Sequence, residues 1–455
     1  MYSDKNIEKI KMQINDISDE AQKLFVEKYY KPTLKEIDEV NEIILSYLKK
    51  SKRKIYGGFA QNKLIENKNK NDTFYKKTDL ADIEFYTFEP VKDLIELTDL
   101  IHKKGYFNTI GKSGIHEGTY KIFSNFHNYC DISYMPKNIY NRCPTIKINN
   151  LIFTHPHFMV IDAFRVYTDL LTSNWRLSKT FNRFTKLMNY YQFNEDFKYE
   201  NIKYKTKIKN LNVIQKFIRD KIVHNSKLIV VGHYAFNYYV KKTDLNKYEI
   251  ENIPYYQLIT DNYEEDCSKI YNILIKKYKK IDSNEYYPFF QFFDRRIEFI
   301  YKNEVILKLY GNNKRCIPFR KSEKKKTLFG TFQLLIMYML IDYNYAIINK
   351  NKTEEENYMS MIVKLFAARN DYLDRNELDV LDDSPFKEFV LECIGKPVEQ
   401  MRAAMEKGLK KIKEGKRFKF DYIPKDGVEI RLPNFNFENQ SGNLIKNKNH
   451  LTKLK

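Results

Sequence analysis

The chain of 455 residues contains few of the residues that cross-link or punctuate small folds: 14 glycines, 12 prolines and 5 cysteines. The cysteines are odd in number, widely spaced and form no CxxC pair; they are Cys130, Cys143, Cys267, Cys316 and Cys393. This pattern argues against a disulfide framework and against a zinc site, and it favours a reducing compartment.

Long apolar runs are also missing. The longest candidate, FQLLIMYMLI (332–341), is too short to span a bilayer and predicts a buried helix instead. The N-terminal stretch MYSDKNIEKIKMQINDISDE is polar and lacks the apolar centre of a signal peptide. We therefore expect a soluble intracellular protein with no membrane partner.

Positive charge, in contrast, is abundant. Lysine and arginine number 79 against 59 acidic residues, a net charge of +20. Part of this excess accompanies a bias toward Lys, Asn, Ile and Tyr that AT-rich genomes produce. A charge of this size still attracts a polyanion, and such binding weakens steeply with salt.

A chain of this length predicts two or three domains. In the first half, capping and apolar periodicity predict helices over 33–53 and 91–105, and further helices over 156–171 and 175–190. Strands are expected at 54–57, 80–86, 119–125 and 127–134. A small sheet with helices packed on it is an α+β unit.

The second half repeats this plan. KLIVVGHYAFNYYVKK (227–242) parallels KIYGGFAQNKLIEN (54–67), and KRCIPFRKSE (314–323) echoes NRCPTIKINN (141–150). We interpret this as a duplicated α+β domain; chance similarity in a biased composition is the alternative. The predicted parts are an N-terminal helical segment (1–53), a first domain with its following helices (54–205), a second domain (206–352), a C-terminal helical region (353–442) and a basic flexible tail (443–455).

The strongest local motif begins at Gly57-Gly58, between a predicted strand and a helix. Asp82 follows Gly58 by 24 positions, and Glu84 shares its strand face because alternate side chains point the same way. Two such carboxylates repel each other unless a cation lies between them, and Mg²⁺ prefers oxygen ligands. A glycine turn before a helix lets a phosphate approach the backbone. Together these features indicate two-metal phosphoryl transfer; a solvated strand face is the alternative.

That chemistry needs a third carboxylate. The alternating stretch FHNYCDISYM (126–135) offers Asp131 on the face opposite its apolar residues, and Asp79 is the next candidate. A glycine pair, a helix, a DxE strand and a single later Asp resemble the nucleotidyltransferase superfamily. The duplicated layout is more specifically similar to the poly(A) polymerase catalytic subunits of poxviruses and mimivirus-like giant viruses.

The resemblance implies a template-independent polynucleotide adenylyltransferase that adds AMP from ATP to RNA 3′ ends. Gly57 and Gly58 would hold the triphosphate, and Asp82, Glu84 and Asp131 would bind Mg²⁺ or Mn²⁺. The partners implied are a single-stranded RNA 3′ end and either a second copy of the chain or a separate processivity subunit. The implied location is the cytoplasm, in a viral factory or virion. Gly-Gly stands where Gly-Ser is frequent in the family, and Glu84 where a second Asp is usual.

The second copy lacks this acid pair. Counting 24 positions from Gly232 places Tyr256 and Leu258 where the first copy has Asp82 and Glu84. The third position is either Glu304 or an apolar residue, depending on the alignment. We expect this copy to be catalytically inactive and retained for packing or RNA binding.

Basic stretches supply candidate phosphate contacts. In NWRLSKTFNRFTKLMNY (174–190), Arg176, Lys179 and Arg183 lie on one helical stripe and would contact the triphosphate or RNA. An ordinary amphipathic helix with a solvated face is the alternative. The denser run 312–326 is expected to meet RNA.

Two other functions stay open at this point. Another terminal nucleotidyltransferase, such as a uridylyltransferase or CCA-adding enzyme, would use the same acids. A non-catalytic RNA-binding processivity subunit would need neither copy to be active.

Overall fold

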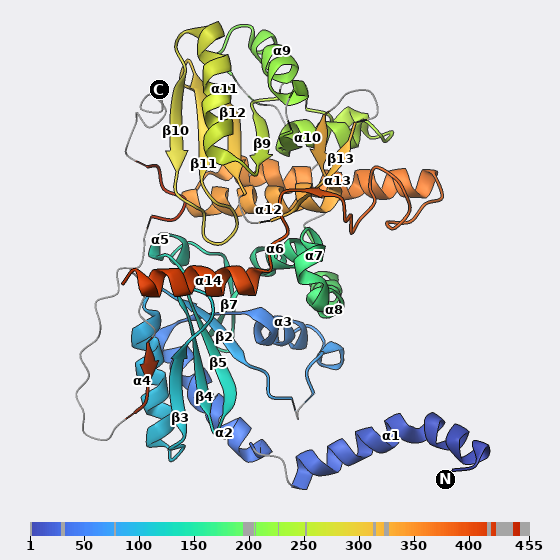
Figure 1. Cartoon of the computed structure of the whole chain (residues 1–455), viewed down its shortest axis with the longest axis vertical. Coiled ribbons are helices and arrows are strands. Elements are labelled where there is room, and N and C mark those ends of the chain that lie inside the picture. The colour runs from blue at the N-terminus through green and yellow to red at the C-terminus, as the bar shows by residue number, and fades with distance from the viewer. Residues whose placement is uncertain are drawn as a thin grey trace. The chain divides into compact units, whose positions relative to one another are not determined.

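The computed structural model describes residues 2–28, 32–76, 79–193, 204, 206–225, 227–250, 253–312, 315–322, 327–415, 420–424 and 440–445. The chain divides into two compact units, each built around one mixed sheet (Figure 1). The first unit comprises Met1–Tyr134, Ile146–Phe153 and Lys410–Asn434, and the second comprises Met135–Thr145, Thr154–Leu409 and Phe435–Lys455.

The first sheet has eight strands among the described residues. Their order is β16 (Asp421–Tyr422), β3 (Thr109–Ser113), β4 (Thr119–Ser124), β5 (His127–Tyr134), β2 (Ile83–Thr87), β1 (Lys54–Tyr56), β7 (Leu151–Thr154) and β6 (Thr145–Ile148). The helices before and between these strands are α1 (Asp4–Lys28), α2 (Leu34–Ser51), α3 (Gly57–Glu66), the 3₁₀ turn η1 (Lys70–Asp72) and α4 (Pro90–Lys103).

Helices α2 and α4 pack together, and α4 covers β3, β4 and β5. Helix α2 forms where the sequence predicts it, because Thr33 Oγ1 accepts a hydrogen bond from the Glu36 backbone N–H at 3.2 Å. Its apolar stripe, which includes Val40, Ile44 and Leu48, is buried.

The second sheet also has eight strands within the described ranges. Their order is β10 (Asp282–Tyr286), β11 (Arg296–Tyr301), β12 (Glu304–Gly311), β9 (Tyr256–Thr260), β8 (Ile229–Val231), β14 (Leu328–Gly330), β13 (Ile317–Lys321) and β15 (Cys393–Ile394). The helices assigned to this unit are α5 (Lys137–Tyr140), α6 (Pro156–Tyr167), α7 (Leu170–Ser173), η2 (Asn174–Arg176), α8 (Leu177–Tyr190), α9 (Leu211–Lys221), η3 (Val223–Asn225), α10 (Gly232–Val240), η4 (Asn246–Tyr248), α11 (Tyr263–Tyr278), α12 (Phe332–Asn349), α13 (Lys352–Arg375) and most of α14 (Gln400–Lys413).

The two sheets share one plan over seven strands. The order β3-β4-β5-β2-β1-β7-β6 corresponds to β10-β11-β12-β9-β8-β14-β13. Strands β2 and β5 are parallel, as are β9 and β12; β1 and β7 are parallel, as are β8 and β14. The α+β prediction is confirmed, and both segments matched in the sequence repeat occupy corresponding strands.

The C-terminal helical region was predicted too broadly. Helix α13 ends at Arg375, no helix is assigned over 376–399, and α14 begins at Gln400. In the part of this segment after Ser384, Phe386 is buried and Glu388 pairs with Arg369 at 2.8 Å. These contacts hold the segment against the helices instead.

The apolar run 332–341 is confirmed as the buried first half of α12, although residues 328–330 before it form a strand. No helix in the described ranges is long and apolar enough to cross a membrane.

The cysteine prediction was wrong for one pair. Cys316, directly before β13, and Cys393 of β15 form a disulfide, while Cys130, Cys143 and Cys267 are buried thiols. The two bonded residues are 77 positions apart, so only the fold brings them together.

The start of the predicted flexible tail runs beside β10. The Tyr287 N–H donates to Asn443 O at 2.9 Å, and the Ile445 N–H donates to Glu285 O at 2.7 Å. Residues 446–455 lie outside the described residues.

A buried ion pair joins the helical layer of the first unit to the start of β1. Arg53, 7% exposed, contacts Asp93 at 2.7 Å, and the Tyr47 hydroxyl donates to the same carboxylate at 2.7 Å. Arg53 also contacts Glu89 at 3.2 Å, but the Glu89 side chain is 39% exposed.

Replacing Asp93 with Ala should lower the free energy of unfolding by about 3–5 kcal/mol, because the Arg53 charge would stay buried without its closest partner. Glu89→Ala is the matched control on the same guanidinium and should cost at most about 1 kcal/mol. Urea unfolding of both variants measures the difference; equal losses would contradict the importance assigned to the buried contact.

Candidate active site

The glycine turn of the first unit is fixed by its neighbour on β2. Gly57 has a φ of +73° and begins α3 directly after β1. The Gly58 N–H donates to Glu84 Oε2 at 2.9 Å. A Cβ added to Gly57 would lie 1.7 Å from that same oxygen. The turn therefore needs glycine for its conformation and for the space that the Glu84 carboxylate occupies.

The predicted acids meet on adjacent strands. Glu84 lies opposite Asp131 in the parallel pairing of β2 with β5, and Asp82 directly precedes β2 on the same face. All three residues are partly exposed. Asp79, the other candidate, instead accepts a hydrogen bond from the Lys76 N–H at 2.8 Å within its own loop.

The thiol of Cys130, directly before Asp131 on β5, is buried. Burial raises the pKa of Cys130 well above its ordinary value, and the charges of Asp131, Asp82, Glu84 and Asp93 raise this pKa further.

Asp131 has two partners that the sequence analysis missed. Lys121 Nζ lies 2.5 Å from its Oδ2, and Asn128 Nδ2 donates to its Oδ1 at 2.8 Å. Lys121 faces Asp131 across the β4–β5 hairpin, whose turn has positive φ at Asn125 and Phe126. Counting outward from this turn pairs Lys121 with Cys130; the one-residue irregularity between Ile122 and Phe123 shifts the pairing to Asp131.

The donor set has the chemistry of a divalent-cation site, because its side-chain ligands would all be carboxylate oxygens. No three His, Cys, Asp or Glu side chains among the described residues already have the geometry to hold a metal ion. Glu84 is bonded to Gly58 and Asp131 to Lys121, whereas Asp82 makes no hydrogen bond or ion pair with the described residues. The Lys121 ammonium contacts Asp131, so a metal ion that binds Asp131 would compete with this ammonium.

The predicted basic stripe belongs to the second unit. Lys179 and Arg183 lie on α8, and Arg176 ends η2 just before it. Phe184 of α8 packs edge-on against Phe164 of α6 at 5.6 Å between ring centroids, so the apolar stripe holds the helix. Arg176 and Lys179 are exposed. Their role toward phosphate stays a prediction.

The pairing of β8 with β9 corrects the sequence match in the second copy. Tyr56, the last residue of β1, pairs with Glu84 on β2, and Val231, the last residue of β8, pairs with Gln257 on β9. Gly57 and Gly232 each follow directly, so these two glycines correspond. Gln257 therefore stands in place of Glu84, and Tyr255 in place of Asp82. The match to Tyr256 and Leu258 made from the sequence was wrong. The match failed for two reasons: it counted from Gly58 rather than Gly57, and 25 positions separate Gly232 from Gln257 against 27 from Gly57 to Glu84.

The third position is neither Glu304 nor apolar. Gln257 lies opposite Lys308 in the parallel pairing of β9 with β12, so Lys308 replaces Asp131. Glu304, at the start of β12, accepts hydrogen bonds from the Thr206 hydroxyl and the Lys207 N–H, both at 2.6 Å.

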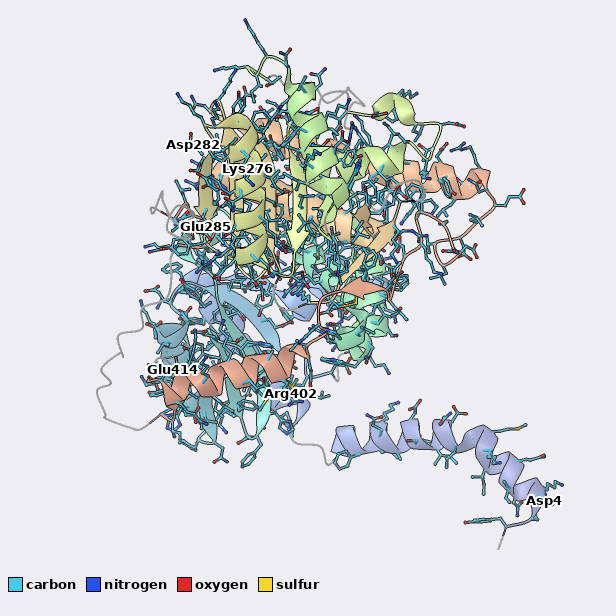
Figure 2. All side chains as sticks on the ribbon, turned by 45° about the horizontal axis from the view of Figure 1, so that its top comes forward. Asp4, Lys276, Asp282, Glu285, Arg402 and Glu414 are labelled. Carbon is cyan, nitrogen blue, oxygen red and sulfur yellow. A yellow bond between two sulfur atoms is a disulfide. The ribbon has the colours of Figure 1, made fainter. Side chains whose placement is uncertain are left out.

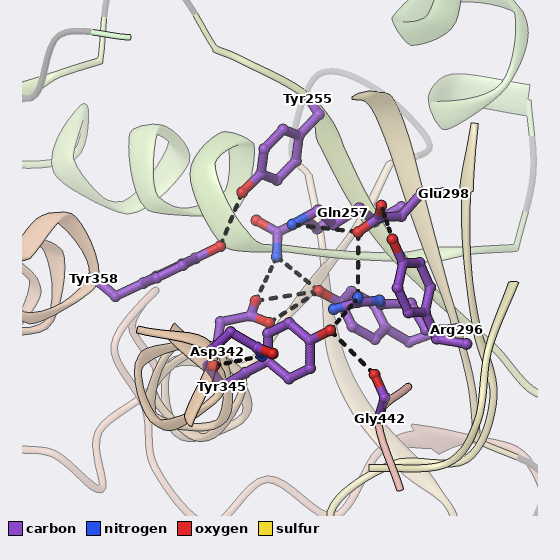
Figure 3. Close-up of polar contacts among 12 residues, drawn as sticks. Tyr255, Gln257, Arg296, Glu298, Asp342, Tyr345, Tyr358 and Gly442 are labelled. Carbon is purple, nitrogen blue, oxygen red and sulfur yellow. Dashed lines mark hydrogen bonds and ion pairs between the residues drawn. The ribbon is translucent and has the colours of Figure 1, made fainter. Parts of the chain in front are cut away.

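A buried polar network fills this part of the second unit (Figure 3). Gln257 Nε2 donates to Asp342 Oδ2 at 2.7 Å, and the Tyr310 hydroxyl donates to the same carboxylate at 3.2 Å. The Tyr255 hydroxyl lies 3.1 Å from that of Tyr358. Lys308 Nζ lies 4.0 Å from the Tyr255 ring centroid, and its side chain is only 13% exposed. Tyr255 and Gln257 are buried, unlike the partly exposed acids of the first unit.

Comparison with known proteins agrees with this geometry. The family described as "Poly(A) polymerase catalytic subunit" matches residues 42–173, and the family "APMV, Putative poly(A) polymerase, catalytic subunit, C-terminal" matches residues 185–455. The chain belongs to the poly(A) polymerase catalytic subunits of giant viruses. It is thus a viral poly(A) polymerase of the nucleotidyltransferase class, as the motif indicated.

Two relatives span nearly the whole chain. A "Putative poly(A) polymerase catalytic subunit" of Acanthamoeba polyphaga mimivirus is 32% identical over 98% of this chain and 83% of its own length. The crystal structure of the Megavirus polyadenylate synthase matches with a TM-score of 0.89 at 32% identity, covering 98% of this chain and 92% of that one. The African swine fever virus protein of the same name (strain Badajoz 1971 Vero-adapted) is 30% identical over 27% of this poly(A) polymerase and 26% of its own length.

Replacing Gly57 with Ala should reduce AMP incorporation about a hundredfold, because the new Cβ would displace the Glu84 carboxylate by an ångström or more. Gly105→Ala is the matched control: its φ is +101°, but a Cβ there meets nothing within 4 Å. Both variants should lose about 1–2 kcal/mol of stability from backbone strain. Activity and urea unfolding are measured on each; equal activity in the two variants would contradict the role assigned to the Gly57–Glu84 contact.

Proposed function

We propose that this poly(A) polymerase extends single-stranded RNA 3′ ends with AMP from ATP, without a template. In the proposed reaction the RNA 3′-oxygen bonds to the α-phosphorus of ATP in line with the departing pyrophosphate. The observation that carries the proposal is the placement of Glu84 and Asp131 opposite each other on parallel strands, beside the Gly57-Gly58 turn.

Asp82, Glu84 and Asp131 would hold Mg²⁺ or Mn²⁺. When bound, such ions would activate the 3′-hydroxyl and neutralise charge on the triphosphate. The extra methylene of Glu84 lets its carboxylate reach the Gly58 N–H. Turning Glu84 toward a cation would free that N–H, at the start of α3, for a phosphate oxygen of ATP.

Arg176, Lys179 and Arg183 are proposed to contact the triphosphate or the RNA phosphates. The exposure of Arg176 and Lys179 supports this role, because α8 is held by its apolar side.

The second copy is proposed to be a degenerate nucleotidyltransferase-like domain. Tyr255, Gln257 and Lys308 carry no negative charge at neutral pH, and a lysine repels the cation that Asp131 would attract. The matched strand order supports a duplicated origin.

The relatives are named catalytic subunits, which supports a separate processivity subunit as partner; self-association of the chain is the other arrangement that the family resemblance implies. The same resemblance supports a cytoplasmic location, in a viral factory or virion.

Primer extension with a short single-stranded RNA, Mg²⁺ and each NTP in turn tests the reaction. The wild type should produce a ladder with ATP alone, and Asp82→Ala with Glu84→Ala should lose at least a thousandfold of this activity, because the cations lose two of three carboxylates. Glu304→Ala removes an acid from the second copy and should extend normally.

A ladder with UTP in place of ATP would indicate a uridylyltransferase, and one limited to CCA would indicate a CCA-adding enzyme. RNA binding without extension would favour the processivity-subunit function instead.

Lys121→Met should lower the Mg²⁺ concentration needed for half-maximal extension several-fold, because the ammonium would no longer compete for Asp131. Lys112→Met is the matched control, since Lys112 lies opposite Lys121 on β3 and its ammonium lies over the Phe123 ring. A Mg²⁺ titration of both variants measures the shift. A higher Mg²⁺ requirement in Lys121→Met would show that Lys121 positions Asp131 rather than competing with the ion.

A further inference from the structure

The second unit contains a cavity of about 460 Å³ on the β9 face opposite Gln257. Tyr256, which alternates with Tyr255 and Gln257 along the chain, lines it. The cavity is therefore separate from the polar network that fills the degenerate site.

Two helices supply its walls through residues at helical spacing. Helix α9 contributes Gln215, Lys216 and Arg219, and α10 with its C-cap contributes Tyr234, Tyr238 and Lys241. Intervals of three and four positions bring Arg219 to the side of Gln215 and Lys216, and bring Tyr238 to the side of Tyr234 and Lys241.

The α10 wall is aromatic. The Tyr238 ring stacks on Phe329 at 4.0 Å between centroids with an interplanar angle of 9°. Tyr234 lies 5.2 Å from Tyr256 and 5.6 Å from Phe329, and it is partly exposed. Packed neighbours thus hold these rings in place, with part of the Tyr234 side chain still accessible.

The α9 wall is positively charged. Lys216 is exposed and makes no hydrogen bond or ion pair with any described residue. Arg219 contacts Asp220 at 3.4 Å, and Lys241 contacts Glu249 at 2.7 Å. Three basic side chains and one carboxylate line the cavity, which leaves positive charge available for an anion.

A buried hydroxyl also lacks a partner there. Thr327 is 1% exposed and lines the cavity, and its Oγ1 has no hydrogen-bond partner within the described part of the chain. Buried hydroxyls are nearly always paired, either with a protein group or with an ordered water.

The corresponding positions of the first copy differ. With Gly57 matched to Gly232, the positions of Tyr238 and Lys241 correspond to Lys63 and Glu66, which form an ion pair with each other at 2.6 Å. The side of the cavity formed by Tyr238 and Lys241 is therefore particular to the second copy, whereas Tyr234 corresponds to another aromatic residue, Phe59.

We propose that this cavity binds one unpaired nucleotide of the RNA substrate. The base of this nucleotide would pack against the Tyr234 ring, and its phosphate would contact Lys216 and Arg219. Proteins that bind single strands combine aromatic stacking with basic side chains in this way. The proposal rests on the proposed function for its choice of RNA. It also assigns a role to the inactive copy, which would retain the strand while the first copy acts on the 3′ end.

The test is binding of a fluorescein-labelled single-stranded RNA to the full chain by fluorescence anisotropy, in EDTA and without ATP. Lys216→Glu and Tyr234→Leu should each weaken binding about tenfold, through a lost phosphate contact and a lost stacking surface. Lys216→Glu should also reduce the salt slope by about one. Tyr234→Phe, which keeps the ring, should bind like the wild type.

Lys276→Glu is the matched charge control, because Lys276 is an exposed lysine on α11 that does not line the cavity (Figure 2). It should bind within about twofold of the wild type. Thermal unfolding checks that each variant is folded, and 4-thiouridine crosslinking should label the α10 segment that contains Tyr234.

Equal weakening by Lys216→Glu and Lys276→Glu would overturn the proposal in favour of general charge attraction. Competition by free AMP at micromolar concentration, with RNA binding unaffected by Tyr234→Leu, would overturn it in favour of a mononucleotide pocket. RNA binding is measured in the absence of catalysis, so the two proposals can fail separately. If the wild type extends RNA but the cavity substitutions leave RNA binding unchanged, only the cavity proposal is contradicted. If the cavity substitutions weaken RNA binding but the wild type extends no RNA, only the proposed reaction is contradicted.

Discussion

The repulsion between neighbouring carboxylates on β2 and β5 is the constraint on which the rest of the candidate site depends. Parallel pairing puts Glu84 directly opposite Asp131, with Asp82 two residues away on the same face. Each of the first two is stabilised by a local donor: the Gly58 N–H for Glu84, and Lys121 with Asn128 for Asp131. Those donors belong to the glycine turn and to the β4–β5 hairpin that border the site. The same backbone elements therefore position the carboxylates and balance their charge.

The second copy removes the same repulsion by changing the residues. Gln257 keeps the shape of a glutamate without its charge, and a Cβ on Gly232 would lie 1.8 Å from its Oε1, much as one on Gly57 would collide with Glu84. Lys308 introduces a positive charge where Asp131 is negative. Burial then becomes possible, and Asp342 from α12 accepts a hydrogen bond from Gln257.

The two copies share structural contacts although their residues at the acid positions differ. Asn62 Oδ1 accepts hydrogen bonds from the backbone N–H groups of Phe74 and Tyr75, and Asn237 Oδ1 accepts one from that of Ile250. In both copies an asparagine five positions after the turn glycine thus anchors the loop that leads to the DxE-type strand. In the second unit Asn237 and Ile250 also line the cavity beside β9.

The sequence by itself determined the local elements of this protein. The Thr33 cap, the glycine turn, the alternation around Asp82 and Glu84, and the hairpin that carries Asp131 all depend on residues close along the chain, so they could be predicted. Only the tertiary structure decided which distant residues meet. The match of Gln257 to Glu84 depends on strand register across a loop that is two residues shorter, and the Cys316–Cys393 bond closes a separation of 77 positions. Side-chain periodicity is a local property, whereas register and long-range contacts are set by packing that a single sequence does not display.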